Sequence, residues 1–235
     1  MLQTPHPSAL RRPAAAVAFL VLACFAVAGP GTVWAGSKKS ADKGKGGKSE
    51  TDALGDKLEG KKPEERIDIL NKIVAAGNPT KEVYFHLGNA KYEKGDPQGA
   101  AEAFEQAVAM DSTFFKAEVN LGLMYDEKQE FAKAIETFER AGALQPNNPD
   151  VWSHMGNTYY SEKKYTDAMD LYRKSLKLDP KAPHALYSMG VAFADAGIFR
   201  EAVKYWKQVV DVDPKSEIGK NASENIQLLQ KYLIP

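Results

Sequence analysis

The chain has 235 residues, of which 43% are hydrophobic and 26% are charged, a composition that excludes an intrinsically disordered protein and fits a folded one. The 31 basic and 31 acidic residues balance overall, but seven basic residues and one acidic residue precede position 49, so 24 basic and 30 acidic residues remain from there on. This mildly acidic balance argues against a nucleic-acid partner.

Residues 1–35 have the layout of a secretory signal peptide. Arg11 and Arg12 precede an apolar stretch of fifteen residues, a Gly-Pro-Gly breaker follows, and Val33 and Ala35 are small residues that a signal peptidase accepts. We therefore predict cleavage after Ala35 and a secreted or periplasmic location. The alternative is an uncleaved membrane anchor, although a spanning helix needs about 20 apolar residues.

Residues 36–62 are rich in Lys, Gly and Ser, and five lysines but only Asp42 among the acids fall within residues 36–48. Such a segment cannot bury enough apolar surface to offset its ordering entropy, so we predict a flexible tether. A solvated linker is the simpler interpretation. The functional alternative is contact of the lysines with an anionic membrane or an envelope polymer.

An amphipathic helix is predicted at the start of residues 63–80. Its apolar side chains fall on one face at helical spacing: Ile67, Leu70, Ile73 and Val74. We expect this helix to cover the beginning of whatever domain follows it.

From residue 81 the sequence repeats with a period of 34 residues. Four glycines keep this period, an alanine follows each by twelve residues and an aromatic residue follows each by sixteen: Gly88, Gly122, Gly156 and Gly190, then Ala100, Ala134, Ala168 and Ala202, then Phe104, Phe138, Tyr172 and Trp206. Each unit has the pattern of two amphipathic helices. A helical glycine costs about 1 kcal/mol relative to alanine, so we expect the glycine to face the alanine and let two backbones approach.

This pattern resembles the tetratricopeptide repeat family, whose 34-residue unit carries these residue types in this order. The four units would span 81–114, 115–148, 149–182 and 183–216. The departures are few, and one of them is Glu118 in place of a bulky residue. The resemblance implies an all-α solenoid of four tandem helix-turn-helix repeats, which needs a covering helix at each end.

The C-terminal cap is predicted in residues 217–235. One face of this helix would cover the fourth repeat with Ala222, Ile226, Leu229 and Leu233.

The resemblance also implies a binding groove, because in this family the first helices of successive repeats line a concave face. Side chains at the second, fifth, ninth, twelfth and thirteenth places of each repeat point into it. Together with a neighbouring asparagine, the predicted groove residues are Glu82, Phe85, Asn89, Tyr92, Glu93, Lys116, Val119, Asn120, Leu123, Asp126, Glu127, Asp150, Ser153, Asn157, Tyr160, Tyr187, Val191 and Asp195.

This set is aromatic and acidic, with Lys116 as its one cation. We therefore expect a protein partner that offers an extended segment of net positive charge with apolar or aromatic anchors. The aromatic members, Phe85, Tyr92, Tyr160 and Tyr187, are expected to be exposed, because the packing positions of the repeat are already filled. The alternative is that one or two of them pack on a neighbouring helix, and we expect this of at least one. The asparagines are expected to bind the backbone of the partner segment.

Nothing in the sequence indicates catalysis, a cofactor or a metal. It has no nucleophile elbow, Gly-rich phosphate loop or paired-histidine zinc motif, and Cys24 lies within the predicted signal peptide. His86 and His154 occupy equivalent places two repeats apart, which is too far to share a metal ion.

Two functional hypotheses follow. The first is a non-enzymatic interaction module and scaffold of the bacterial cell envelope, which binds an extended partner segment in its groove. The second is a self-assembling scaffold, in which a terminal helix of one copy enters the groove of the next.

Overall fold

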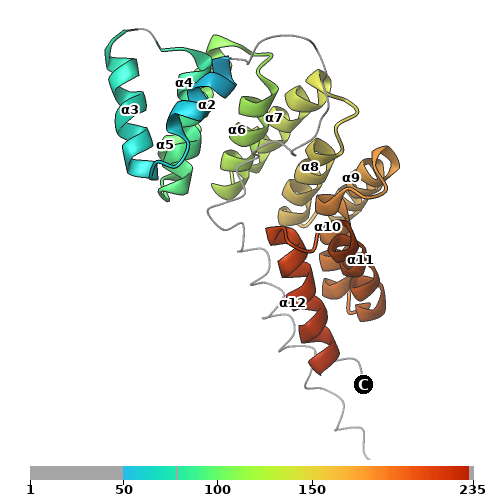
Figure 1. Cartoon of the computed structure of the whole chain (residues 1–235). Helices are drawn as coiled ribbons and strands as arrows, with labels where there is room; N and C mark the ends of the chain where they lie inside the picture. The colour runs from blue at the N-terminus through green and yellow to red at the C-terminus, as the bar shows by residue number, and fades with distance from the viewer. Residues whose placement is uncertain (1–49, 78, 233–235) are drawn as a thin grey trace, which may run out of the picture. The chain divides into compact units, whose positions relative to one another are not determined.

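A computed structural model describes residues 50–77 and 79–232, and this part of the chain contains eleven α-helices and no strand (Figure 1). The predicted signal peptide and most of the predicted tether lie outside the described residues. The described residues form two compact units, 50–179 and 180–232, which we call the N-terminal and C-terminal units. None of the described helices has the length and apolar character needed to span a membrane.

The N-terminal unit contains eight helices. They are α2 (Glu50–Leu58), α3 (Pro63–Ala75), α4 (Lys81–Glu93), α5 (Pro97–Met110), α6 (Phe115–Glu127), α7 (Phe131–Leu144), α8 (Pro149–Ser161) and α9 (Tyr165–Leu178). The C-terminal unit contains α10 (Pro183–Asp195), α11 (Phe199–Val212) and α12 (Glu217–Tyr232). The expected all-α fold of tandem helix pairs is confirmed, with first helices α4, α6, α8 and α10 and second helices α5, α7, α9 and α11.

The turn inside each repeat is set by one residue with a left-handed backbone. Gly95, Gln129, Lys163 and Gly197 have φ of 86°, 59°, 64° and 74°, and they are spaced by the repeat period. Glycine adopts this conformation without steric cost, whereas other L-residues do so at about 1–2 kcal/mol. The second and third repeats therefore hold strained turns at Gln129 and Lys163.

The repeated glycines make room for an aromatic ring. A Cβ added at Gly156 would lie 2.6 Å from Cε1 of Tyr172 and 3.3 Å from the carbonyl oxygen of Ala168. At Gly88 and Gly122 the nearest atoms likewise belong to the phenylalanine sixteen residues later. The close approach was expected at the alanine, but the tightest contact is with the ring, because the aromatic side chain fills the space between the two helices.

The predicted tether is wrong at its C-terminal end, where Glu50–Leu58 forms helix α2. Leu58 is 4% exposed and packs in one cluster with Leu70, Val83 and Leu87, and half-buried Leu54 borders that cluster. Two leucines four residues apart thus supply an apolar face, which the Lys- and Gly-rich composition of the wider segment conceals.

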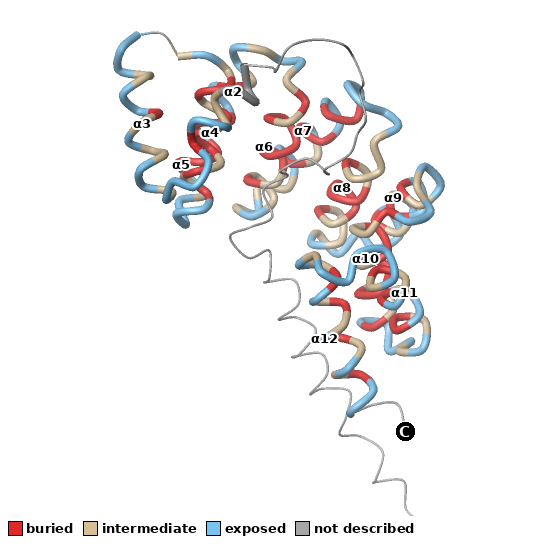
Figure 2. The backbone as a smooth tube through the Cα atoms, viewed as in Figure 1, coloured by how far each residue is buried: buried red, intermediate tan, exposed pale blue. Residues whose placement is uncertain are grey.

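The outer helices cover the ends of the helix pairs within their own units. Helix α3 packs against α4 with Leu70 fully buried, and Figure 2 shows the rest of α3 as half-buried or exposed. Helix α12 packs against α11 and α10 with Ala222 and Leu229 buried. Ile226 is half-buried, and Leu233 lies outside the described residues.

The second repeat has an ion pair between a buried acid and an exposed arginine at the place where the family has a bulky residue. Glu118 on α6 is fully buried and accepts hydrogen bonds from Arg140 on α7, with Nε to Oε1 and Nη2 to Oε2 both at 3.0 Å. In the third repeat the equivalent positions hold Trp152 and Lys174, and the ammonium of Lys174 lies 3.0 Å from the centroid of the indole ring. Arg140 and Lys174 therefore occupy equivalent positions, but Arg140 forms an ion pair with Glu118 whereas Lys174 forms a cation–π contact with Trp152.

Candidate binding face

The first helices α4, α6 and α8 present the predicted groove positions of the N-terminal unit. We call these positions the first-helix face. Six of them are buried inside the protein: Glu82, Phe85, Tyr92, Val119, Asn120 and Ser153. The half-buried or exposed members are Asn89, Glu93, Lys116, Leu123, Asp126, Glu127, Asp150, Asn157 and Tyr160. In the C-terminal unit, Val191 is buried, Tyr187 is half-buried and Asp195 is exposed.

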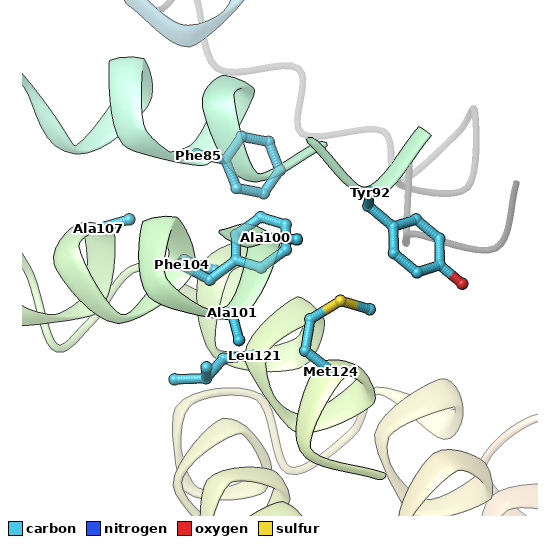
Figure 3. Packing of buried hydrophobic residues seen from close by; sticks show 9 residues of the cluster. Phe85, Tyr92, Ala100, Ala101, Phe104, Ala107, Leu121 and Met124 are labelled. Atoms are coloured by element: carbon cyan, nitrogen blue, oxygen red, sulfur yellow. The ribbon is translucent and has the colours of Figure 1, made fainter. Parts of the chain in front are cut away.

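The prediction that Phe85 and Tyr92 are exposed is wrong, because each is 5% exposed and belongs to the hydrophobic core (Figure 3). The Phe85 ring lies 5.9 Å from that of Phe104 and 5.2 Å from that of Phe114, measured between centroids. Helix α5 presents mostly alanine to this core, so first-helix aromatics fill the space that larger second-helix side chains would otherwise take. These two residues stabilise the fold and are not available to a partner.

Tyr187 is also engaged inside its own unit. Its hydroxyl accepts a hydrogen bond from Asn225 of α12 at 3.1 Å, and its backbone carbonyl accepts one from the Trp206 indole at 3.1 Å. A half-buried tyrosine held in this way supports the packing of α12, so removing it would disturb the C-terminal cap.

Tyr160 remains on the first-helix face and pairs with a residue that the sequence reasoning missed. Its ring meets that of Tyr165, the first residue of α9, edge to face at 4.9 Å, and Tyr165 is 52% exposed. Phe131 and Phe199 hold the equivalent places in the second and fourth repeats, and this recurrence could have revealed the position.

The asparagines form hydrogen bonds within the protein, although they were expected to bind a partner. Asn120 is fully buried and donates to Oδ1 of Asn89 at 3.1 Å, which links α6 to α4. Asn157 accepts a hydrogen bond from the Tyr172 hydroxyl at 2.8 Å, and Ser153 is hydrogen-bonded to Ser175 at 2.8 Å. Asn120 therefore positions its neighbour and does not itself reach the surface.

Asp126 is an acid of the face whose pKa is shifted by its surroundings. Burial raises its pKa to about 6, and the nearby Thr158 side chain of α8 lowers it only in part. Its Oδ1 atom is buried and has no hydrogen-bond partner among the described residues. The contact between Asp126 and Thr158 also places the last turns of α6 and α8 side by side.

The other acids of the face differ in how far they are neutralised. Glu93 forms a two-pronged ion pair with Arg66 of α3, and Glu82 lies 3.9 Å from the ammonium of Lys81. Glu127 and Asp150 form no ion pair within residues 50–77 and 79–232. The last turns of α6 and α8 thus bring Leu123, Asp126, Glu127 and Tyr160 to one end of the face, with Tyr165 beside them; we call this set the acidic-aromatic end.

Among the described residues, no group of three or more His, Cys, Asp or Glu side chains is arranged to hold a metal ion. The first-helix face can offer hydrogen bonds, negative charge and aromatic surface to a ligand.

Comparison with known families matches three stretches of the chain to tetratricopeptide repeat models: residues 85–149 and 184–216 to models described as tetratricopeptide repeat, and residues 156–197 to one described as TPR repeat. The chain belongs to the tetratricopeptide repeat family, whose members are generally non-catalytic modules for protein–protein interaction.

Several solved structures named MamA resemble the chain in fold. One, titled "Crystal structure of MamA", is 26% identical with a TM-score of 0.56, and the match covers 79% of this chain and 99% of that one. A second, titled "Crystal structure of MamA protein", is 27% identical with a TM-score of 0.57 and coverages of 79% and 94%. A comparison with curated proteins found no match. The family and these structures together indicate that the protein is a scaffold for protein–protein interaction.

Proposed function

We propose that this protein is a non-enzymatic scaffold of the bacterial cell envelope and that its first-helix face binds an extended, positively charged segment of a partner protein. The signal-peptide layout of residues 1–35 supports the location, with retention by an uncleaved N-terminal helix as the alternative. The acidic-aromatic end of the face supports the binding mode.

The observation that carries the proposal is the joint presence of unneutralised carboxylates and accessible apolar surface on adjacent first helices. Glu127 is exposed, and Leu123 and Tyr160 are half-buried. Tyrosine at an interface buries a large area at low entropic cost, so Tyr160 and Tyr165 would supply affinity. The carboxylates would raise the association rate and reject acidic competitors.

Of the four aromatic anchors expected from the sequence, we retain Tyr160, and we add its neighbour Tyr165. Phe85, Tyr92 and Tyr187 support packing, so the partner segment would be held mainly beside Tyr160 and Tyr165. Lys116 lies in the first turn of α6, at the opposite end of that helix from Asp126 and Glu127. Asp150 lies in the first turn of α8, so the basic part of the partner segment should extend from the last turn of α6 to the first turn of α8.

The experiment uses three synthetic peptides that share one aromatic anchor and differ in net charge: positive, zero and negative. Binding to residues 36–235 is followed by fluorescence anisotropy. We expect the positive peptide to bind most tightly, and the double substitution Glu127→Lys and Asp150→Lys to weaken it by about tenfold, since each partly exposed pair contributes up to about 1 kcal/mol.

The matched control is Glu139→Lys with Asp167→Lys, which reverses two exposed charges on the second helices α7 and α9. This control should leave binding unchanged. Equal affinity for all three peptides, or equal losses in both double variants, would show that the first-helix face is not the binding surface.

A further inference from the structure

The chain carries a basic segment whose charge is complementary to its own first-helix face. Residues 36–48 hold five lysines and one aspartate, with no large apolar side chain. The face exposes Glu127 and half-buried Asp150 without ion pairs in the described part, and Asp126 holds a buried carboxylate oxygen without a hydrogen-bond partner there. A lysine side chain carries three donors on a long flexible stem, so it can reach a recessed carboxylate.

The segment is also tethered close to that face. It ends next to Glu50, the first residue of α2, and α2 packs against α4 with Gly55 beside the His86 ring. An α-helix with its side chains is about 10–12 Å across, so α8 is roughly 20 Å from α4 with α6 between them. Thirteen residues can span about 45 Å when extended, so the segment is long enough to reach Glu127 in the last turn of α6 and Asp150 in the first turn of α8.

We propose that residues 36–48 bind the first-helix face of their own chain and compete with the partner segment for it. This inference rests on the proposed function, because the two ligands share one surface. The segment offers lysines but no aromatic or large apolar anchor, so it occupies the carboxylates and leaves the Tyr160–Tyr165 pair unfilled. A partner with both features displaces it, whereas a merely basic peptide does not.

The strength of this competition follows from effective concentration. A short flexible link holds a segment at an effective concentration of about 1 mM near its site. With an intrinsic dissociation constant of about 0.1 mM, such a segment weakens a competing basic ligand by roughly tenfold. The effect should decline as salt rises, because these charges are partly exposed.

The test measures binding of a fluorescent synthetic peptide with the sequence of residues 36–48 to three versions of residues 36–235. They are the unchanged chain, a chain with Lys38, Lys39, Lys43, Lys45 and Lys48 replaced by Gln, and a chain with the same lysines replaced by Arg. We expect the Gln chain to bind the peptide about tenfold more tightly than the other two. The Arg chain keeps the charge and is the matched control.

Two further variants locate the site. Adding Glu127→Lys and Asp150→Lys to the Gln chain should abolish the gain, and adding Glu139→Lys and Asp167→Lys should not. Equal affinities for all three chains would overturn the proposal, as would a gain that survives Glu127→Lys and Asp150→Lys. Light scattering must show a monomer, since a concentration-dependent dimer would assign the segment to the face of a second copy.

The test of internal competition can fail while the proposed scaffold function stands. If the aromatic-anchored positive peptide binds the face but the peptide of residues 36–48 does not, the internal competition is wrong and the scaffold function stands. If the lysines bind only vesicles of anionic lipid, the segment is a membrane contact and the proposal fails. If neither peptide binds, both proposals fail.

Discussion

Replacing Gly156 with alanine should destabilise the protein even though alanine is the better helix former. The added Cβ would lie 2.6 and 2.8 Å from Cε1 and Cδ1 of Tyr172, distances at which something must move. Tyr172 is fully buried, and its hydroxyl is held by Asn157 at 2.8 Å, so the ring has little room to retreat. Overpacking of this kind costs about 3 kcal/mol at the upper end of its range, and the better helix propensity returns about 1 kcal/mol.

The net loss of about 2 kcal/mol should lower the thermal midpoint by roughly 4–8 °C, as measured by circular dichroism. Gly55→Ala is the matched control, because its Cβ would lie 3.5 Å from the His86 ring, an ordinary contact. That variant should gain up to about 1 kcal/mol from helix propensity alone. Combining Gly156→Ala with Tyr172→Leu should cost less than the sum of the two single changes, since the clash is removed.

A Gly156→Ala protein at least as stable as the unchanged chain would refute the reasoning. So would strict additivity with Tyr172→Leu, because the penalty would then have a source other than the ring.

Three further predictions concern stability. Lys163→Gly should stabilise the protein by about 1 kcal/mol, because it relieves a left-handed backbone in a turn; an unchanged or lower urea midpoint would contradict this. Arg140→Ala should destabilise by about 2–3 kcal/mol, because it leaves the buried Glu118 without its cation, and adding Glu118→Leu should restore much of the loss; failure of that rescue would argue against the buried charge as the cause. Asp126→Asn should stabilise the protein relative to the unchanged chain by up to about 2 kcal/mol above pH 6, and by progressively less as pH falls toward 4. The reason is that the folded state raises the pKa of this acid from 3.8 to about 6 and so favours its neutral form. A difference in urea midpoint between the two proteins that is the same above pH 6 and at pH 4 would count against it.

The repeat architecture could be predicted because it depends on periodic positions. The 34-residue spacing of Gly156 and its equivalents marks places where a helix must lack a side chain, and such places leave a clear trace in a sequence. Proline at the first helical position of α3, α5, α8 and α10 likewise marks where helices begin.

The binding face was predicted less well, because exposure depends on what the neighbouring helices supply. Phe85 and Tyr160 occupy places assigned to the same face, but alanine-rich α5 draws Phe85 into the core while Tyr160 stays partly accessible. Asn120 was expected to bind the backbone of the partner segment, yet it is buried and donates a hydrogen bond to Asn89. Pairwise contacts of this kind are decided by three-dimensional packing, which a one-dimensional pattern does not contain.

The Glu118–Arg140 pair has a consequence for assembly of the repeats. Tandem units of similar sequence can pair a helix with the wrong neighbour during folding, a characteristic failure of repeat proteins. The positions equivalent to Arg140 carry glutamine in the first and fourth repeats, Gln106 and Gln208, so Glu118 placed against either would be a buried carboxylate without a cation. Such a charge costs several kcal/mol, so a single acid at the bulky position makes the second helix pair distinguishable from the first and fourth and penalises a shift of one unit toward the first repeat.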